Sequence, residues 1–200
     1  MAFEQRGKSG GSRKRSSGFS SSRGGSDESA DAKPAREKKP PTPERLEQRA
    51  RNVLLHQLAR SAKSTHQLRK ILEQREIPSE IAERVLVRFT EVGLIDDQAY
   101  AETIVNSRRN FKGLSKSAIK RELNEKGVPA PFIEQAIESI TAEDDLVAAQ
   151  ELAARRIRQM STLAKDVRER RLAGYLGRKG YPSSVVFAAI RFAESQLELD

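Results

Sequence analysis

One pattern recurs three times along the chain and constrains its fold more than any other feature. Each copy is a run of apolar residues at helical spacing that ends in Gly or Glu, an apolar residue and then proline. The prolines are Pro78, Pro129 and Pro182, so successive copies lie 51 and 53 residues apart. A unit of about 50 residues holds three helices, and such a trio hides its apolar face by stacking on its neighbours. The sequence therefore predicts tandem three-helix repeats. The alternative, a single nine-helix bundle with accidental similarity, does not account for the near-constant period.

The patterning is helical from Leu46 onward. Apolar residues recur at intervals of three and four, and the alternation and Asn-Gly or Asp-Gly turns that mark strands are missing. Ser64 and Gln67 are spaced as a capping box, and Gly127 and Gly180 stand where helices are expected to stop. These signals predict an all-α fold. We expect an elongated, curved array of three tandem three-helix repeats, at 46–97, 98–145 and 146–200.

Residues 1–45 have a different composition. They are rich in Ser, Gly and Pro, contain few apolar side chains and carry +5 of the formal net charge of +9. Such a segment cannot bury enough apolar surface to offset the entropy lost on ordering, so we expect a disordered, solvated tail. A weak, nonspecific contact with nucleic acid is the alternative. An organelle transit peptide is disfavoured, because the segment has no amphipathic periodicity.

Composition excludes several classes of protein. The chain has no Cys, which excludes a disulfide framework, a thiolate zinc site, an iron–sulfur cluster and a cysteine nucleophile. His56 and His66 stand without further ligands, so we expect no metal and no cofactor. No apolar run is long enough to span a membrane, and the N-terminus lacks the apolar core of a signal peptide. These features indicate a cytoplasmic protein without membrane contacts.

Two acidic pairs invite a catalytic interpretation but are better explained as helix signals. Paired carboxylates can share acid–base work when their pKa values are forced apart. Asp96 and Asp97, however, directly precede a helical run, where Asp is preferred at the N-cap and in the first turn. Asp144 and Asp145 hold the same place before the third repeat. Since no nucleophile elbow or phosphate-binding Gly-rich loop occurs either, we predict no enzymatic activity.

Positive charge is concentrated at equivalent places in the second and third repeats. Residues 105–126 contain seven Lys or Arg against two acidic residues, and residues 155–180 contain nine against two. A patterned basic footprint is typical of a surface that contacts an acidic partner, whereas the alternative is a set of solvated side chains in local ion pairs. The candidate partner-binding residues are Arg108, Arg109, Lys112, Lys116, Lys120, Arg121, Arg155, Arg156, Arg168, Arg170, Arg171 and Lys179.

The spacing of these residues gives two further expectations. Lys112, Lys116 and Lys120 lie four residues apart, so they share one helix face if the helix reaches back to Lys112. Phe111 and Tyr175 are the aromatic residues near the clusters, but Tyr175 has the spacing of a core residue. We therefore expect neither stacking on bases nor sequence-specific base recognition.

The most specific motifs surround the second repeat. Residues 93–101 read Gly-Leu-Ile-Asp-Asp-Gln-Ala-Tyr-Ala, a Lys-Gly loop follows at 112–113, and residues 119–128 read Ile-Lys-Arg-Glu-Leu-Asn-Glu-Lys-Gly-Val. Together these motifs resemble the bacterial RecX family, regulators of the RecA recombinase, over about residues 46–195. Two departures stand out. Leu114-Ser115 replaces an aromatic residue and Gly after the loop, and the third repeat has Met160-Ser161-Thr162 in place of a Lys-Gly loop.

The resemblance implies a monomeric, non-enzymatic modulator of RecA. A protein of this family would consist of three tandem three-helix repeats, bind RecA and the RecA–DNA filament, lie in the filament groove and restrain filament growth, ATPase and strand exchange. The basic clusters in the second and third repeats would be prominent in that contact. The rival interpretation is a helical DNA-binding protein that acts directly on single- or double-stranded DNA, with RecA playing no part.

Overall fold

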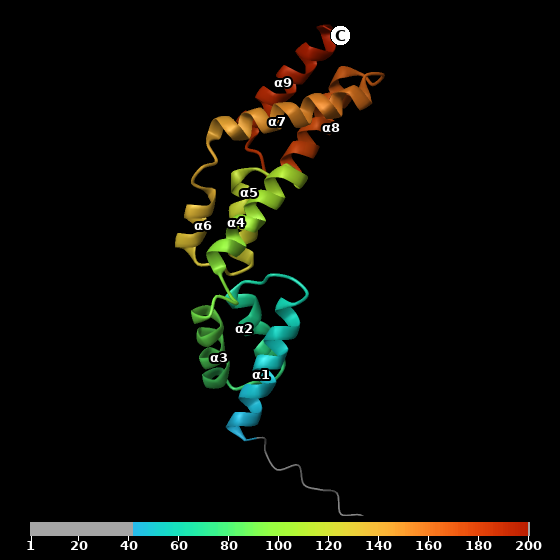
Figure 1. Cartoon of the computed structure of the whole chain (residues 1–200). Helices are drawn as coiled ribbons and strands as arrows, with labels where there is room; N and C mark the ends of the chain where they lie inside the picture. The colour runs from blue at the N-terminus through green and yellow to red at the C-terminus, as the bar shows by residue number, and fades with distance from the viewer. Residues whose placement is uncertain (1–41, 200) are drawn as a thin grey trace, which may run out of the picture. The chain divides into compact units, whose positions relative to one another are not determined.

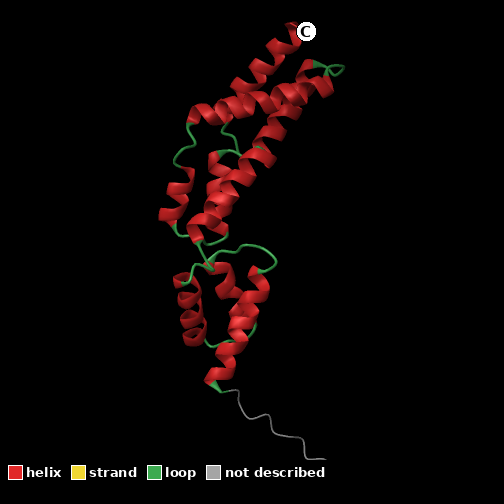
Figure 2. Ribbon diagram, viewed as in Figure 1, coloured by secondary structure: helices red, strands yellow, loops and turns green. Residues whose placement is uncertain are grey.

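The computed structural model of the chain describes residues 42–199. The expected disorder of the tail at 1–45 falls outside the described residues, apart from the last four residues of that segment. Over 42–199 every regular element is a helix and none is a strand, which confirms the all-α prediction (Figures 1 and 2). The helices form three trios, and each trio has its own cluster of buried apolar side chains.

The first trio consists of α1 (Pro43–Leu58), α2 (Thr65–Gln74) and α3 (Ser79–Glu91). Helix α1 begins before the expected repeat boundary at 46, because the Thr42 side chain accepts the N-cap hydrogen bond from Arg45 and a proline fills the first helical position. The capping box predicted at the start of α2 is present. The core of this trio is built on Leu54, Leu68, Leu72 and Leu86.

The second trio consists of α4 (Asp97–Ser107), α5 (Lys116–Glu125) and α6 (Ala130–Ile137), with a short π-helix, η1 (Arg108–Lys112), directly after α4. Asp96 is the N-cap of α4 and accepts a hydrogen bond from the Ala99 N–H at 2.9 Å, which confirms the capping interpretation. Helix η1 ends at Gly113, which has a φ of +57°. The core contains Ile119, Leu123 and Ile133.

The third trio consists of α7 (Ala142–Ile157), a short 3-10 turn η2 (Arg158–Met160), α8 (Lys165–Arg178) and α9 (Ser183–Leu199). Its middle helix differs from the other two. Helix α8 begins seven residues before Leu172, whereas α5 begins three residues before the equivalent Ile119. Its N-cap residue is Ala164, which makes no side-chain cap hydrogen bond, whereas α2 and α5 are capped by the side chains of Ser64 and Ser115. The third repeat has therefore gained one helical turn at this position.

The first and second trios are joined by hydrogen bonds at the N-terminus of α2. The Ser64 hydroxyl donates to the carbonyl oxygen of Lys126 at 2.5 Å. The Thr65 N–H donates to the Asp97 carboxylate at 2.9 Å. Asp97 thus satisfies a free N–H of a helix in the preceding trio, in addition to standing in the first turn of its own helix.

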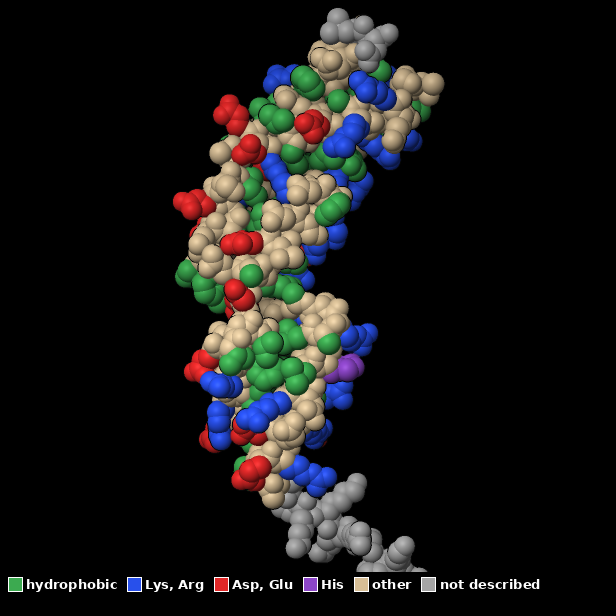
Figure 3. Space-filling view, viewed as in Figure 1, with side chains coloured by type: hydrophobic (Ala, Val, Ile, Leu, Met, Phe, Trp, Pro, Cys, Tyr) green, Lys and Arg blue, Asp and Glu red, His purple; other side chains and the backbone are tan. Residues whose placement is uncertain are grey.

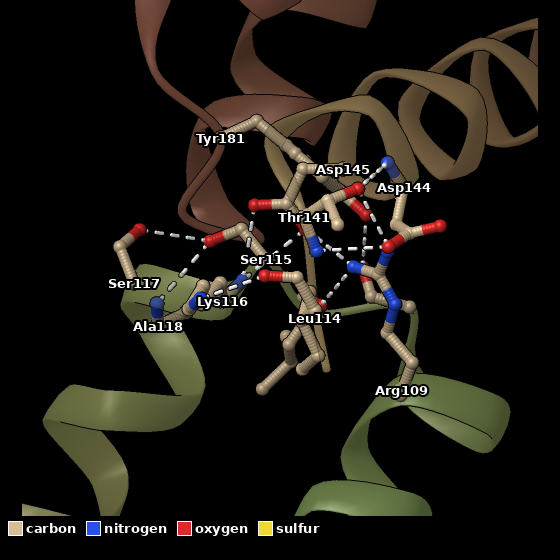
Figure 4. Close-up of polar contacts among 12 residues, drawn as sticks. Arg109, Leu114, Ser115, Lys116, Ser117, Ala118, Thr141, Asp144, Asp145 and Tyr181 are labelled. Atoms are coloured by element: carbon tan, nitrogen blue, oxygen red, sulfur yellow. Dashed lines mark hydrogen bonds and ion pairs between the residues drawn. The ribbon is translucent and has the colours of Figure 1, made fainter. Parts of the chain in front are cut away.

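The second and third trios are joined in the same way at the N-terminus of α5 (Figure 4). The Ser115 hydroxyl donates to the carbonyl oxygen of Gly180 at 2.7 Å, and the Lys116 N–H donates to the Asp145 carboxylate at 3.1 Å. The Tyr181 hydroxyl donates to the carbonyl oxygen of Gly113 at 3.1 Å. Burial raises the pKa of Tyr181 to about 12, so this hydroxyl remains a donor at neutral pH.

Close approach of the trios explains the glycines that end α5 and α8. Gly127 and Gly180 both have positive φ, +69° and +84°. A Cβ at Gly180 would lie 2.6 Å from the Cβ of Ala118, and a Cβ at Gly127 would overlap the ring of His66. The equivalent residue of the first trio is Glu76, which has a φ of +58° despite its side chain. Since no described trio precedes the first one, Glu76 adopts the left-handed backbone conformation but is not also required to leave room for a neighbouring trio.

Candidate partner-binding surface

Two arginines of the second trio's cluster form internal ion pairs. Arg108 donates to both carboxylate oxygens of Glu122, at 2.7 and 2.5 Å, and its side chain is 18% exposed. This hydrogen bonding lowers the pKa of Glu122 and raises that of Arg108. Arg109 pairs with Asp145 and also donates to the carbonyl oxygen of Leu114 at 3.3 Å (Figure 4). Both arginines therefore hold η1 in place, and Arg109 also links the second trio to the third.

The three regularly spaced lysines do not share a face. Lys112 belongs to η1, and the left-handed residue Gly113 separates it from α5, so the helix does not reach back to Lys112 as the shared face required. Lys116 donates from Nζ to the carbonyl oxygen of Ile140 at 2.7 Å. Lys120 lies 2.5 Å from Glu134 in an exposed ion pair. Lys112 therefore belongs to a different part of the surface from the other two.

Two ion pairs of the third trio's cluster differ in burial. Arg168 donates to both carboxylate oxygens of Glu194, at 3.1 and 2.6 Å, and the Glu194 side chain is 6% exposed. This pair ties the added turn of α8 to α9. Arg155 reaches Glu151 at 4.0 Å, with both side chains largely exposed. Exposed pairs of this kind contribute little to stability, so Arg155 remains free to contact a partner.

Four other arginines of this cluster line a cleft beside α8. The cleft has a volume of about 460 Å³ and lies between η2 and one face of α8. Arg171, Gly174, Tyr175 and Arg178 share this face, because they are spaced by three and four residues. The full lining comprises Arg156, Gln159, Met160, Arg170, Arg171, Gly174, Tyr175 and Arg178.

The cations of this cleft are largely unpaired. Arg156 donates to Gln159 at 2.6 Å and lies 5.8 Å from the centre of the Tyr175 ring. Within residues 42–199, Arg170 and Arg171 make no ion pair, and neither does Arg121 of the second trio. In Figure 3, Lys and Arg side chains of the second and third trios gather toward the right-hand edge, and acidic side chains lie mainly on the left.

Lys179 connects the two clusters. Its Nζ donates to the carbonyl oxygen of Lys112 and lies 5.1 Å from the centre of the Tyr175 ring. The loop that carries Lys112 is therefore in direct contact with the end of α8. Of the twelve candidate residues, those on this continuous surface are Lys112, Arg156, Arg170, Arg171 and Lys179.

Two features of this surface were not predicted from the sequence. Phe111, on η1, is 88% exposed, although an isolated Phe gives no sequence signal of exposure. Gly174 stands in the interior of α8, where a Cβ would meet only the Arg178 guanidinium, at 3.4 Å. A glycine inside a helix that packing does not require is a signal available from the sequence.

The second acidic pair and the two histidines have local structural surroundings. In the second acidic pair, Asp144 completes a capping box with Thr141 at the start of α7. His56 is exposed and His66 packs against Gly127. Within residues 42–199 no group of three or more His, Asp or Glu is placed to hold a metal ion. No helix in the same range is long and apolar enough to cross a membrane.

Comparison with known proteins gives one consistent result. Three family descriptions match successive parts of the chain: the RecX first three-helix domain at residues 50–89, the second at 96–137 and the third at 143–190. The chain is 43% identical to a regulatory protein RecX of Streptomyces coelicolor over 157 residues, which is 78% of this chain and 83% of that protein. It is 37% identical to a RecX of Thermobifida fusca over 149 residues, 74% of this chain and 80% of that one.

Solved structures agree on the fold. The crystal structure of RecX from Lactobacillus salivarius superposes with a TM-score of 0.64 at 19% identity, covering 75% of this chain and 97% of that chain. A second crystal structure of a regulatory protein RecX superposes with a TM-score of 0.61 at 26% identity, covering 72% of this chain and 70% of that one.

Proposed function

Because the chain belongs to the RecX family of regulatory proteins, we propose that it binds the RecA recombinase and RecA filaments on DNA in the cytoplasm. Binding restrains filament growth, and with it the DNA-dependent ATPase and strand exchange. The observation that carries this proposal is the continuous cationic surface of Lys112, Lys179 and the α8 cleft, whose arginines lack acidic partners among the described residues.

The joined trios support binding to a polymer. Both junctions use a Ser hydroxyl, a helix N-terminus and an Asp carboxylate from the next trio, so the spacing between trios is held by directed hydrogen bonds. A helical array presents a long surface and no deep enclosed site. A filament presents one subunit after another, and an array with fixed spacing meets more than one of them without losing entropy on ordering.

The proposed mechanism is binding, without a chemical step. Unpaired arginines attract acidic groups and orient a partner that carries them. Guanidinium groups bind carboxylates or phosphates through two parallel hydrogen bonds, so Arg171 and Arg178 can engage either kind of group on a protein–DNA filament. A protein seated across neighbouring subunits blocks the next subunit from adding.

Two activities of RecA test the proposal. The full-length chain is added at substoichiometric amounts to RecA on single-stranded DNA, and ATP hydrolysis and strand exchange are followed. We expect both to fall as the chain is added. No effect at any ratio, with protein shown by circular dichroism to be folded, would contradict the proposal.

A further inference from the structure

Phe111 is exposed to solvent on the π-helix η1, whose backbone is held in place on both sides of the ring. Among the large apolar side chains of residues 42–199 it has the highest exposed fraction, 88%, and Phe187 follows at 64%. Its π-helix is held before it by the Arg108–Glu122 pair and after it by the contacts of Lys112 and Gly113 with the third trio. Short π-helical segments occur frequently at functional sites. The backbone that carries the ring is therefore already ordered before a partner binds, which lowers the entropy cost of binding.

Cations lie along the segment that carries this ring. Lys112 is the next residue, and Lys179 reaches the same loop through the Lys112 carbonyl oxygen. From Lys179 the positive surface continues past Tyr175 to Arg178 and on to Arg171 in the cleft. The Tyr175 ring is half-buried and already has Arg156 and Lys179 near it, so Phe111 is the aromatic group available to a ligand.

Gly174 opens the floor of the cleft to a ligand. Glycine in a helix interior costs about 0.5–1 kcal/mol relative to alanine. A Cβ at this position would make only an ordinary contact, so packing does not explain the glycine. Its absence of a side chain lets an anionic group come close to α8 between Arg171 and Arg178.

We infer that this surface binds single-stranded nucleic acid directly. Phe111 stacks on an unpaired base, and Lys112, Lys179 and the arginines of the cleft contact the phosphates on one side of it. An exposed aromatic ring beside a basic track is the arrangement that binds single strands without reading their sequence. Duplex DNA satisfies this arrangement less well, because its base faces are covered by neighbouring pairs. This reverses the expectation from the sequence that the aromatic residues near the clusters do not stack on bases.

The chemistry around the ring favours a nucleic acid over a protein partner. Anchoring aromatic residues of protein interfaces lie in a patch depleted in charged residues, and charge collects at the rim. Phe111 instead has Lys112 and the exposed amide of Asn110 as its immediate neighbours.

Binding of a labelled single-stranded oligonucleotide, measured by fluorescence anisotropy with RecA absent, tests the inference. Phe111→Ala is expected to weaken binding about 5- to 150-fold, the range for loss of one stacked base. Phe111→Trp is expected to bind as the unchanged chain does. Phe187→Ala, an exposed Phe on α9, is the matched control and should leave binding unchanged.

An abasic oligonucleotide of the same length separates stacking from charge. On this ligand Phe111→Ala should bind like the unchanged chain, because no base is left to stack. Arg171→Gln/Arg178→Gln should weaken binding to both oligonucleotides and make the salt dependence shallower, by about 0.7 in slope for each lost phosphate contact.

Several outcomes would overturn the inference. One is that the unchanged chain does not bind single strands. Another is that Phe111→Ala weakens binding no more than Phe187→Ala. A third is that Phe111→Ala leaves DNA binding intact but abolishes co-sedimentation with RecA filaments, which would make Phe111 a protein contact. Since the binding assay contains no RecA, its failure is distinguishable from failure of the proposed RecA regulation.

Discussion

The basic clusters at 105–126 and 155–180 hold equivalent places in their repeats, yet the protein uses their side chains differently. In the first cluster, Arg108 and Arg109 are paired with Glu122 and Asp145 and brace the fold. In the second, one arginine is paired in this way and most of the others line an open cleft. A count of charges therefore does not separate structural cations from those available to a partner, whereas their ion pairing and burial do.

Removing a structural partner should have the largest effect. Asp145→Ala leaves Arg109 without its carboxylate and the N-terminus of α5 without an acceptor. Breaking a buried pair in this way costs about 3–5 kcal/mol in free energy of unfolding. Urea denaturation followed by circular dichroism measures the loss. A loss below about 1 kcal/mol would show that Arg109 is a surface cation, like most arginines of the second cluster.

Replacing Gly174, inside α8, and Gly180, just after α8, by alanine should change stability in opposite directions. Gly180→Ala forces a side chain into the left-handed region and against Ala118, at a cost of at least about 2 kcal/mol. Gly174→Ala should instead stabilise the chain by about 0.5–1 kcal/mol, because it replaces a helix-interior glycine where the new Cβ would meet only the end of the flexible Arg178 side chain. Thermal denaturation of both variants checks the signs. Destabilisation by Gly174→Ala would mean that packing requires this glycine.

Acid should reduce the stability that the Arg108–Glu122 pair gives the folded chain. Its pKa is lowered in the folded chain by the hydrogen bonds from Arg108, so the unfolded chain binds its proton at higher pH. The stabilising contribution is therefore complete above the unfolded pKa, about 4.3, and is lost as pH falls through the lower folded pKa.

The matched variants for this pH dependence are Glu122→Gln and Glu151→Gln, the second at an exposed carboxylate. Glu122→Gln should lower stability at pH 7 and make the decline of stability between about pH 5 and pH 2 shallower. Urea unfolding at a series of pH values provides the measurement. If stability declined with falling pH in the same way for both variants, the pairing with Arg108 would not make the pKa of Glu122 differ between the folded and unfolded states.

Substitution of the cleft arginines should have the smallest effect on stability. Arg171→Gln and Arg178→Gln remove exposed cations without a described acidic partner, so the free energy of unfolding should change by less than about 0.5 kcal/mol. Urea denaturation of the double variant is the check. A larger loss would place these arginines with the structural cations of the first cluster.

Local signals in the sequence predicted the features that depend on neighbouring residues. The all-α fold, the capping box at Ser64, the N-cap at Asp96 and the helix ends at Gly127 and Gly180 all follow from patterns within a few positions. Such features are set by backbone propensity and by side chains that reach only their own turn.

Features that depend on residues far apart in the chain were not visible. The Arg109–Asp145 pair spans 36 residues and the Ser115–Gly180 hydrogen bond spans 65. The break after Lys112 came from a π-helix that apolar spacing does not encode, and it removed the shared face expected for three lysines. Phe111 lies on the same π-helix and is 88% exposed, which a pattern of residue types does not reveal.

Inhibition of the RecA ATPase by the Arg171→Gln/Arg178→Gln variant shows whether the α8 cleft contacts the filament. Arg88→Gln, which removes an exposed cation of the first trio, is the control. If the α8 cleft contacts the filament, the double variant stays folded but needs at least about tenfold more protein for half-inhibition, equivalent to about 1.4 kcal/mol of binding, and Arg88→Gln inhibits like the unchanged chain. Equal inhibition by the double variant and the unchanged chain would contradict the claim that these free cations are the partner-binding surface.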